Sequence, residues 1–290
     1  MASGSPGPAG GSVAQVFSGF MVNTWLAATM VAVVAGLLGF FIVLRGAAFV
    51  AHAVPNGAFA GAAAASLLGV STLLGLGSFA VVGALGVSWL SRRGRHDVVT
   101  ALALVLMLGL GALFLSMSQE YAEETFALLF GDVVGVSGAE LWPILGLGVV
   151  CVLATLLLFR PLLLNSVMPD VGESQKVSAS RMEIYFVLLV ALATTMTVPI
   201  VGAFLMFSLM IAPAAAARSL AASPAVAMGL GVGIALVTIW AAIVLAYLSS
   251  WPIGFFVGSL GATAYGAARA LVYYRQRGPR RGPTALDPAA

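Results

Sequence analysis

Residues 183–217 decide the fold of this chain, and they read EIYFVLLVALATTMTVPIVGAFLMFSLMIAPAAAA. A helix that crosses a bilayer needs roughly 20 predominantly apolar residues, and this stretch is long enough for two such helices. We therefore expect spans over 183–199 and 200–217, joined by a tight connection at 197–199. The stretch predicts an α-helical protein embedded in a membrane.

The composition of the whole chain agrees with this prediction. Of its 290 residues, 61% are hydrophobic and only 8% are charged, whereas about a quarter of a soluble domain is charged. So few charges cannot cover a surface that faces water, and most of the surface must therefore face lipid. The 34 glycines favour the same conclusion, because small residues let membrane helices approach each other closely.

Other apolar stretches are also long enough to cross a bilayer, namely 20–44, 72–91, 98–118, 140–159, 225–248 and 252–273. The stretch 47–70 is one more candidate, but polar residues, Pro55 and glycines interrupt it, so we expect a broken or distorted helix. The segment 126–138 is too short to span, and we expect an interfacial helix or a re-entrant piece.

The chain is thus predicted to be an all-α integral membrane protein, a polytopic bundle of eight or nine transmembrane helices over residues 20–273. Residues 1–19 carry no charged side chain and many Gly, Ser and Pro residues, and we expect a flexible tail. Residues 274–290 are rich in Arg, Gly and Pro, and we expect a disordered basic tail there.

Positive charges set the expected orientation, because cytosolic loops of membrane proteins carry an excess of Lys and Arg. The basic residues that can share the cytosolic side are Arg45, Arg92, Arg93, Arg95, Arg160, Lys176, Arg181, Arg218, Arg269, Arg275, Arg277, Arg280 and Arg281. The C-terminus then lies in the cytosol. With nine spans the N-terminus lies outside, and with eight the region 20–70 is folded differently. This placement accounts for the net charge of +3 without a nucleic-acid partner.

His52 and Asn56 are the candidate metal ligands, because polar groups at membrane depth are costly and tend to be functional. They are four positions apart, so on a helix they share one face. Imidazole binds zinc, copper and other transition metals, and an amide oxygen is a weaker ligand. The pair supplies at most half of a tetrahedral zinc site. The alternative is a packing pair that satisfies backbone groups near Pro55.

Two polar segments are candidate contact surfaces for partner proteins. In the long connection 160–182, a polar helical turn between two spans could dock a cytosolic partner or be an ordinary connector, and it contains Asp170, Val171, Gly172, Glu173, Ser174 and Gln175. On the expected outer side, an acidic run could draw cations or contact an external partner, or be a solvated loop, and it contains Glu120, Glu123 and Glu124.

Enzymatic chemistry is not expected within this chain. No Gly-x-x-x-x-Gly-Lys-Ser/Thr sequence is present, so the usual loop that holds ATP phosphates is absent. The two histidines, His52 and His96, belong to no Ser-His-Asp set and no zinc-protease motif. Any ATP hydrolysis that drives this protein is therefore expected on a separate subunit.

Four segments, in order along the chain, resemble the zinc/manganese ABC permease family, also called the ABC-3 family. They are the run Leu38 to Gly61, the segment Leu128 to Ser137, the stretch Val201 to Arg218, and the motif Trp251-Pro252-Ile253-Gly254. The third is similar to the family's Val-Gly…Pro-Ala-Ala-Thr-Ala-Arg stretch, and the fourth to its Pro-Thr-Gly opening of the last span. Together the resemblance covers roughly residues 20–273.

One departure from the family pattern concerns the candidate ligands. The family usually has Gly-Asp-x-x-x-His-x-x-x-Pro-Gly here, in which the Asp and His are thought to meet the metal. Aligned on Gly61, this chain has His52 at the aspartate position, Asn56 at the histidine position and Ala60 at the proline. A site without the anionic ligand should hold a hard cation such as Mn²⁺ less well, so zinc is the more favoured cargo.

The resemblance implies the membrane permease subunit of an ABC importer of the vitamin B12/metal type, called type II, in a bacterial plasma membrane. It implies a homodimer of the permease, an ABC ATPase subunit at the segment around Asp170, and an extracytoplasmic metal-binding protein. No cofactor is implied, since the metal ion is the cargo. The alternatives are an ABC permease for a metal chelate or haem, an unrelated secondary transporter or channel, and a structural scaffold.

Overall fold

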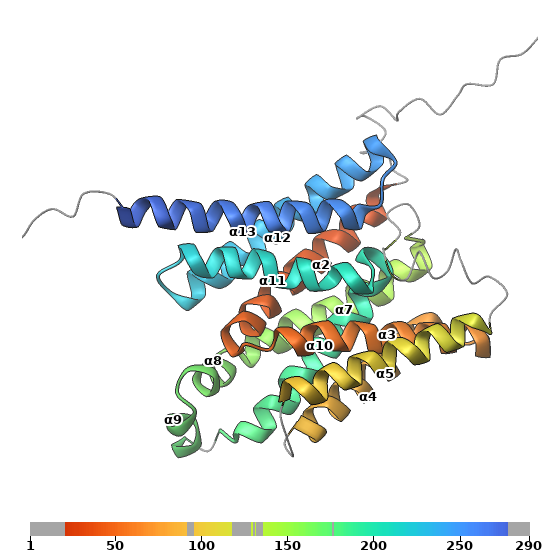
Figure 1. Ribbon diagram of the computed structural model, residues 1–290, viewed down its shortest axis with the longest axis horizontal. Helices are drawn as coiled ribbons and strands as arrows, with labels where there is room; N and C mark the ends of the chain where they lie inside the picture. The colour runs from red at the N-terminus through yellow and green to blue at the C-terminus, as the bar shows by residue number, and fades with distance from the viewer. Residues whose placement is uncertain are drawn as a thin grey trace, which may run out of the picture.

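The structure is a computed structural model that describes residues 21–91, 96–117, 129, 131, 136–175 and 177–277. The helices shown in Figure 1 are α2 (Val22–Arg45), α3 (Ala48–Leu68), α4 (Thr72–Ser91), α5 (His96–Ser116), α7 (Gly138–Leu157), α8 (Phe159–Val167), α9 (Pro169–Ser174), α10 (Ala179–Val201), α11 (Ala203–Leu220), α12 (Pro224–Ser249) and α13 (Ile253–Arg277). The expected tails over 1–19 and 274–290 lie outside the described residues, except for residues 274–277, which are the helical end of α13.

The helical membrane fold expected from the sequence is confirmed. Within the described ranges, six helices are long and apolar enough to cross a membrane by length and composition, namely α2, α4, α7, α10, α12 and α13. The apolar parts of α5 and α11 are shorter. Among the described residues, these helices together with α3 account for the eight or nine spans that the hydrophobic pattern predicts.

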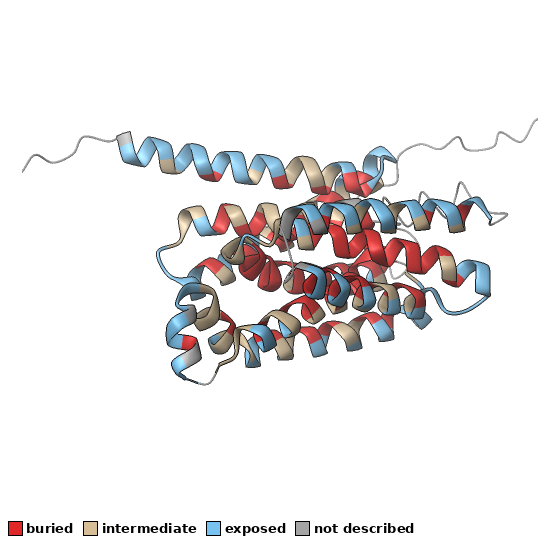
Figure 2. Ribbon diagram, turned by 60° about the horizontal axis from the view of Figure 1, so that its bottom comes forward, coloured by how far each residue is buried: buried red, intermediate tan, exposed pale blue. Residues whose placement is uncertain are grey.

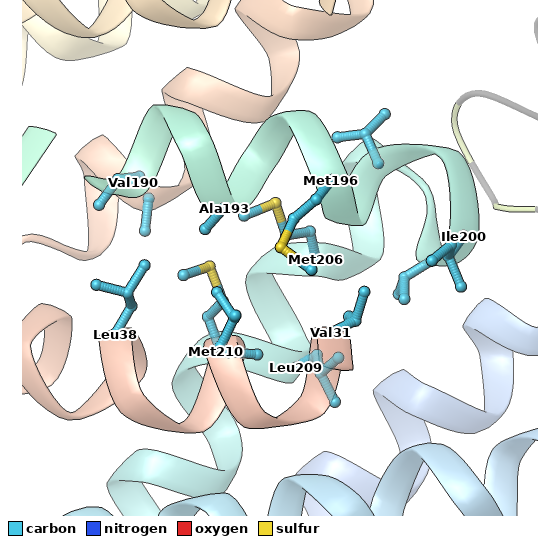
Figure 3. Packing of buried hydrophobic residues seen from close by; sticks show 14 of the residues in the cluster. Val31, Leu38, Val190, Ala193, Met196, Ile200, Met206, Leu209 and Met210 are labelled. Atoms are coloured by element: carbon cyan, nitrogen blue, oxygen red, sulfur yellow. The ribbon is translucent and has the colours of Figure 1, made fainter. Parts of the chain in front are cut away.

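Helix α10 joins two groups of helices. On one side α3 packs against α4 and α5, and on the other α2 packs against α7, α11 and α12, while α13 covers α11. Figure 1 shows α11, α12 and α13 in the upper part of the molecule and α4 and α5 in the lower part, and Figure 2 shows that buried residues concentrate in the interior while α13 is largely exposed. The core where α2, α10 and α11 meet is apolar, and Leu38, Val190, Met196, Met206 and Met210 point into it (Figure 3).

Local sequence signals explain where several helices begin and end. Helix α7 starts with a capping box, in which the Ser137 side chain accepts a hydrogen bond from the Glu140 N–H and the Glu140 carboxylate accepts one from the Ser137 N–H. These bonds satisfy N–H groups that a helix start leaves unpaired. Helix α2 ends at Gly46, which has a left-handed backbone with a φ of 66°, a conformation that glycine adopts without steric cost.

Helix α3 is continuous through Pro55, so of the two expected forms of 47–70, a broken or a distorted helix, the broken one is wrong. Proline removes one backbone hydrogen bond, but membrane helices tolerate it where the protein surrounds them. Residues on either side of Pro55 are buried, and Gly61 lies directly against the backbone of Gly75 in α4. A side chain on either glycine would meet the other's carbonyl oxygen, so α3 and α4 pack with their backbones in close contact.

The connection between α10 and α11 differs from the expected turn at 197–199. Helix α10 continues through Pro199 to Val201, and α11 begins at Ala203. The chain reverses at Gly202, whose φ of 85° suits glycine. The backbone of Leu129 and Gly131 lies against this turn, so a described part of the segment 126–138 seals it. The expected connection at 249–252 is present, with Ser250 in a left-handed conformation.

Candidate functional site

His52 and Asn56 lie in the first turns of α3 and face the interior of the bundle. Asn56 is 1% exposed and its side-chain N–H donates to the His52 carbonyl at 2.7 Å. That bond directs the amide oxygen of Asn56 away from its own helix. The imidazole of His52 meets the ring of Phe207 in α11 edge-on, with ring centroids 5.0 Å apart. The i, i+4 spacing thus places both side chains on one helix face, as expected.

In His52 and Asn56, the atoms that could bind a metal make no hydrogen bond to the described residues. The Nδ1 of His52 and the Oδ1 of Asn56 are both buried without a hydrogen-bond partner among the described residues. A buried polar atom without a partner costs about 1–3 kcal/mol, and such groups are rare in folded proteins. Neutral imidazole nitrogen and amide oxygen each carry a lone pair that a cation can accept. Within the part of the chain that the structure describes, both lone pairs are therefore free of a hydrogen bond.

The described residues do not complete a metal site of the usual kind around this pair. Among the described residues, no group of three or more His, Cys, Asp and Glu side chains could hold a metal ion. A tetrahedral zinc site needs four ligands, and His52 with Asn56 gives two. The described residues therefore give half of such a site at this pair.

A second polar cluster lies where α2, α8 and α10 meet, and the sequence analysis did not predict it. The Arg45 side chain, which ends α2, donates from Nε to the Ser166 hydroxyl at 2.9 Å and from Nη2 to the Asn165 Oδ1 at 2.9 Å. Its guanidinium also lies 4.7 Å from the centre of the Phe186 ring. Every one of these partners is far from Arg45 in sequence, so spacing along the chain could not reveal them.

This cluster borders a cavity of about 470 Å³ at the end of the bundle that carries α8 and α9. Glu183 in α10 also lines the cavity, and its carboxylate accepts a hydrogen bond from the buried Ser88 hydroxyl at 2.9 Å. Glu183 is the first residue of an expected span. A carboxylate at that position is the sequence signal that could have marked Glu183 as a candidate functional residue. We call Arg45, Ser88, Asn165, Ser166 and Glu183 the Arg45 cluster.

The expected docking segment forms the short helix α9, which projects from the bundle together with α8 (Figure 1). The exposed residues are Asp170, Val171, Ser174 and Gln175. Gly172 is buried and lies near the backbone of Asn165 and Val177. The side chain of Glu173 lies outside the described residues, as do Glu120, Glu123 and Glu124. The predicted helical turn is therefore present and presents its polar residues to the surroundings.

The fold and these two clusters define a multi-spanning helical membrane protein with polar side chains held inside its bundle. A family model described as the ABC 3 transport family matches residues 18–268. The chain belongs to this family, which confirms the resemblance seen in the sequence.

Individual relatives agree with this assignment. The chain is 30% identical over 203 residues to the manganese import system permease protein ScaB of Streptococcus parasanguinis. This alignment covers 68% of this chain and 71% of the relative. It is 26% identical over 212 residues to the high-affinity zinc uptake system membrane protein ZnuB of Haemophilus influenzae, with 72% and 81% covered.

A solved structure shares the fold. PsaBC from Streptococcus pneumoniae in complex with Fab superposes with a TM-score of 0.80 at 21% identity, over 87% of this chain and 91% of that chain.

Proposed function

We propose that this chain is the membrane permease subunit of an ABC importer for a divalent transition metal, in a bacterial plasma membrane. The observation that supports this most directly is the buried pair on α3 with its unpartnered Nδ1 of His52 and Oδ1 of Asn56. Relatives named as manganese and zinc import permeases lie in the same family. A cation that passes the pair would meet two ligand atoms that have no hydrogen-bond partner among the described residues.

Zinc is the proposed cargo, because the donors of the pair are neutral. Manganese favours carboxylate and water oxygens, whereas imidazole suits zinc. Two copies of the chain, related by a two-fold axis, would supply two imidazole nitrogens and two amide oxygens, the number of ligands in a tetrahedral zinc site. The proposed assembly is therefore a homodimer with the transit site between its subunits.

The proposed partners act on opposite sides of the membrane. An ABC ATPase docks at α9 on the cytosolic side, where the exposed Asp170 and Val171 lie, and ATP is hydrolysed on that subunit. A metal-binding protein delivers the ion from outside, where the acidic residues Glu120, Glu123 and Glu124 are proposed to meet the protein or the ion. ATP binding shifts the permease between two packings of similar free energy.

The test is metal accumulation in cells that express the complete transporter, measured by elemental mass spectrometry. Wild type is compared with His52→Ala and Asn56→Ala. His96→Ala and Asn23→Ala are matched controls, since His96 is the other histidine of the chain and Asn23 lies at the start of α2. We expect zinc to accumulate in wild type and in the controls, and both site variants to lose it while still co-purifying with the ATPase.

Two outcomes contradict the proposal. If wild type accumulates no transition metal, the protein carries another substrate. If the two site variants accumulate as much metal as wild type, the pair on α3 serves packing and does not contact the ion. Accumulation of manganese in preference to zinc would overturn the choice of metal but leave the transit pair in place.

A further inference from the structure

The Arg45 cluster connects the proposed docking segment to the candidate metal pair. Asn165 and Ser166, the partners of the Arg45 guanidinium, lie in the last turn of α8, immediately before α9. The Ser166 hydroxyl also donates to the Leu162 carbonyl at 2.6 Å, which fixes its oxygen as the acceptor for Arg45. A force applied at α9 therefore reaches the end of α2 through two short hydrogen bonds.

The end of α2 is in turn fixed to the start of α3. The Ala47 N–H donates to the Ile42 carbonyl at 3.0 Å, and the Ala51 N–H donates to the Ala47 carbonyl at 3.1 Å. This closed connection leaves no flexible loop between Arg45 and α3. His52 directly follows Ala51 and lies about one turn into α3, so a displacement of Arg45 can be passed through this connection to the candidate metal pair.

Arg45 also has a second set of partners available across the cavity. Glu183 lines the same cavity of about 470 Å³ and is engaged with Ser88 in this structure. The Phe186 ring, one turn further along α10, already lies 4.7 Å from the guanidinium centre. An arginine between neutral partners on one helix and a carboxylate on another has two favourable positions, because both kinds of hydrogen bond are charge-assisted. The cavity provides the space for the side chain to move between them.

We infer that Arg45 is a positioning residue that links the ATPase cycle to the metal pair by exchanging its partners. In one state it holds α8 through Asn165 and Ser166, as seen here, and in the other it pairs with Glu183 of α10. When the docking helix moves, the exchange carries the α2–α3 connection and His52 with it. This inference rests on the proposed function, since it requires an ATPase docked at α9.

The test measures movement of the α2–α3 connection and needs no knowledge of the metal. Cys151 is the single cysteine of the chain and is buried, so it is replaced by Ala. Phe49, which is 54% exposed and lines the cavity, is replaced by Cys as the reporter. The permease is purified with its ATPase in nanodiscs, and the rate of labelling with a maleimide is measured without nucleotide and after vanadate trapping.

We expect trapping to change the labelling rate several-fold when Arg45 is present. In Arg45→Gln the ratio of the two rates should approach one, while ATP hydrolysis persists without coupled metal uptake. Arg45→Lys should recover part of the ratio, because lysine keeps the charge but not the planar fork. Arg269→Gln, an exposed arginine of α13, is the matched control and should keep the full ratio.

Substitutions at the other end of the contact guard against a simple folding defect. The pair Asn165→Ala and Ser166→Ala, together in one chain, should reproduce Arg45→Gln, and Glu183→Gln should also reduce the ratio because one of the two states loses its partner. A full ratio in an assembled Arg45→Gln complex overturns the inference, and so does a wild-type ratio of one. Absence of metal uptake with the ratio intact would instead contradict the proposed function alone.

Discussion

The polar atoms at the end of α2 and those at the start of α3 lie close together in the chain but are satisfied to very different degrees. The Arg45 guanidinium has a hydroxyl, an amide oxygen and an aromatic ring as partners. His52 Nδ1 and Asn56 Oδ1 are buried and have no hydrogen-bond partner in the described ranges of the chain. Polar side chains inside a membrane protein cost free energy in both regions, but only the paired Arg45 contacts stabilise the bundle by themselves.

The two regions differ in function: the contacts of Arg45 hold helices together, whereas the atoms of His52 and Asn56 are available to a ligand. A polar group that is fully paired within the protein fixes the helices that carry it. A polar group that is buried and unpaired lowers stability and persists where a ligand completes it. The comparison therefore predicts opposite responses to substitution in the two regions, which experiments can separate by measuring transport and stability on the same variants.

The largest expected effect is on transport in His52→Leu. Loss of an outer partner of a metal ligand typically costs about 10–100-fold in metal affinity or activity, and loss of the ligand itself should cost about 100-fold or more in metal uptake. Stability should stay the same or rise, because an apolar side chain replaces an unpaired nitrogen. Uptake and the melting temperature of the purified permease are the two measurements. A clear fall in melting temperature would mean that His52 is a structural residue.

Arg45→Leu should show the reverse pattern on stability. It leaves Asn165 and Ser166 without their donor, which should lower the free energy of unfolding by about 1–3 kcal/mol. Thermal unfolding in detergent, compared with the exposed Arg269→Leu, measures this change. An unchanged melting temperature would show that the Arg45 contacts contribute nothing to the free energy of unfolding. The two regions would then not differ in how they affect stability.

A smaller effect is expected at the exposed helix α9. Asp170→Lys reverses a charge on the proposed docking surface, and like-charge contacts at an interface mainly slow association. We expect affinity for the ATPase to fall about tenfold, which is about 1.4 kcal/mol, and to fall further at low ionic strength. Co-purification and surface plasmon resonance would measure it, with Arg269→Glu as a charge-reversal control. Undiminished binding would place the docking surface elsewhere.

The smallest effect is expected from Phe207→Leu. This change removes the aromatic edge that packs on His52 but no ligand. Aromatic pairs contribute about 0.5–1.5 kcal/mol, so uptake should fall by a factor of about 2–10 and recover in Phe207→Tyr. A loss as complete as that of His52→Leu would mean that Phe207 itself blocks or opens the pathway.

Much of the fold could be predicted from the sequence because one physical pattern dominates it. Continuous apolar stretches identify the spans, and the ends of α4, α7 and α12 fall within a few residues of the expected limits. The turn at Gly202 was misplaced because Pro199 is a frequent breaker, but inside a membrane a helix can continue through proline. Helix α3 stays continuous through Pro55 for the same reason.

The candidate site was only partly predictable. His52 and Asn56 stand out because both are polar in an apolar helix at a spacing that shares a face. Nothing in the sequence pairs Arg45 with Asn165 and Ser166, which follow it by 120 and 121 positions. Such contacts depend on how helices cross, and the crossing is set by packing of small residues such as Gly61 against Gly75. The chemistry of one helix face can be predicted, whereas a junction of three helices requires the fold.

The turn at Gly202 also has a consequence for how the chain is made. Helix α11 has 18 residues, which is about 27 Å at 1.5 Å per residue, and a single residue separates it from α10. Because the connection has so little slack, we expect α10 and α11 to leave the translocation machinery as one unit. The backbone of Leu129 and Gly131, which seals the turn, is synthesised earlier and can close over the hairpin as soon as it arrives.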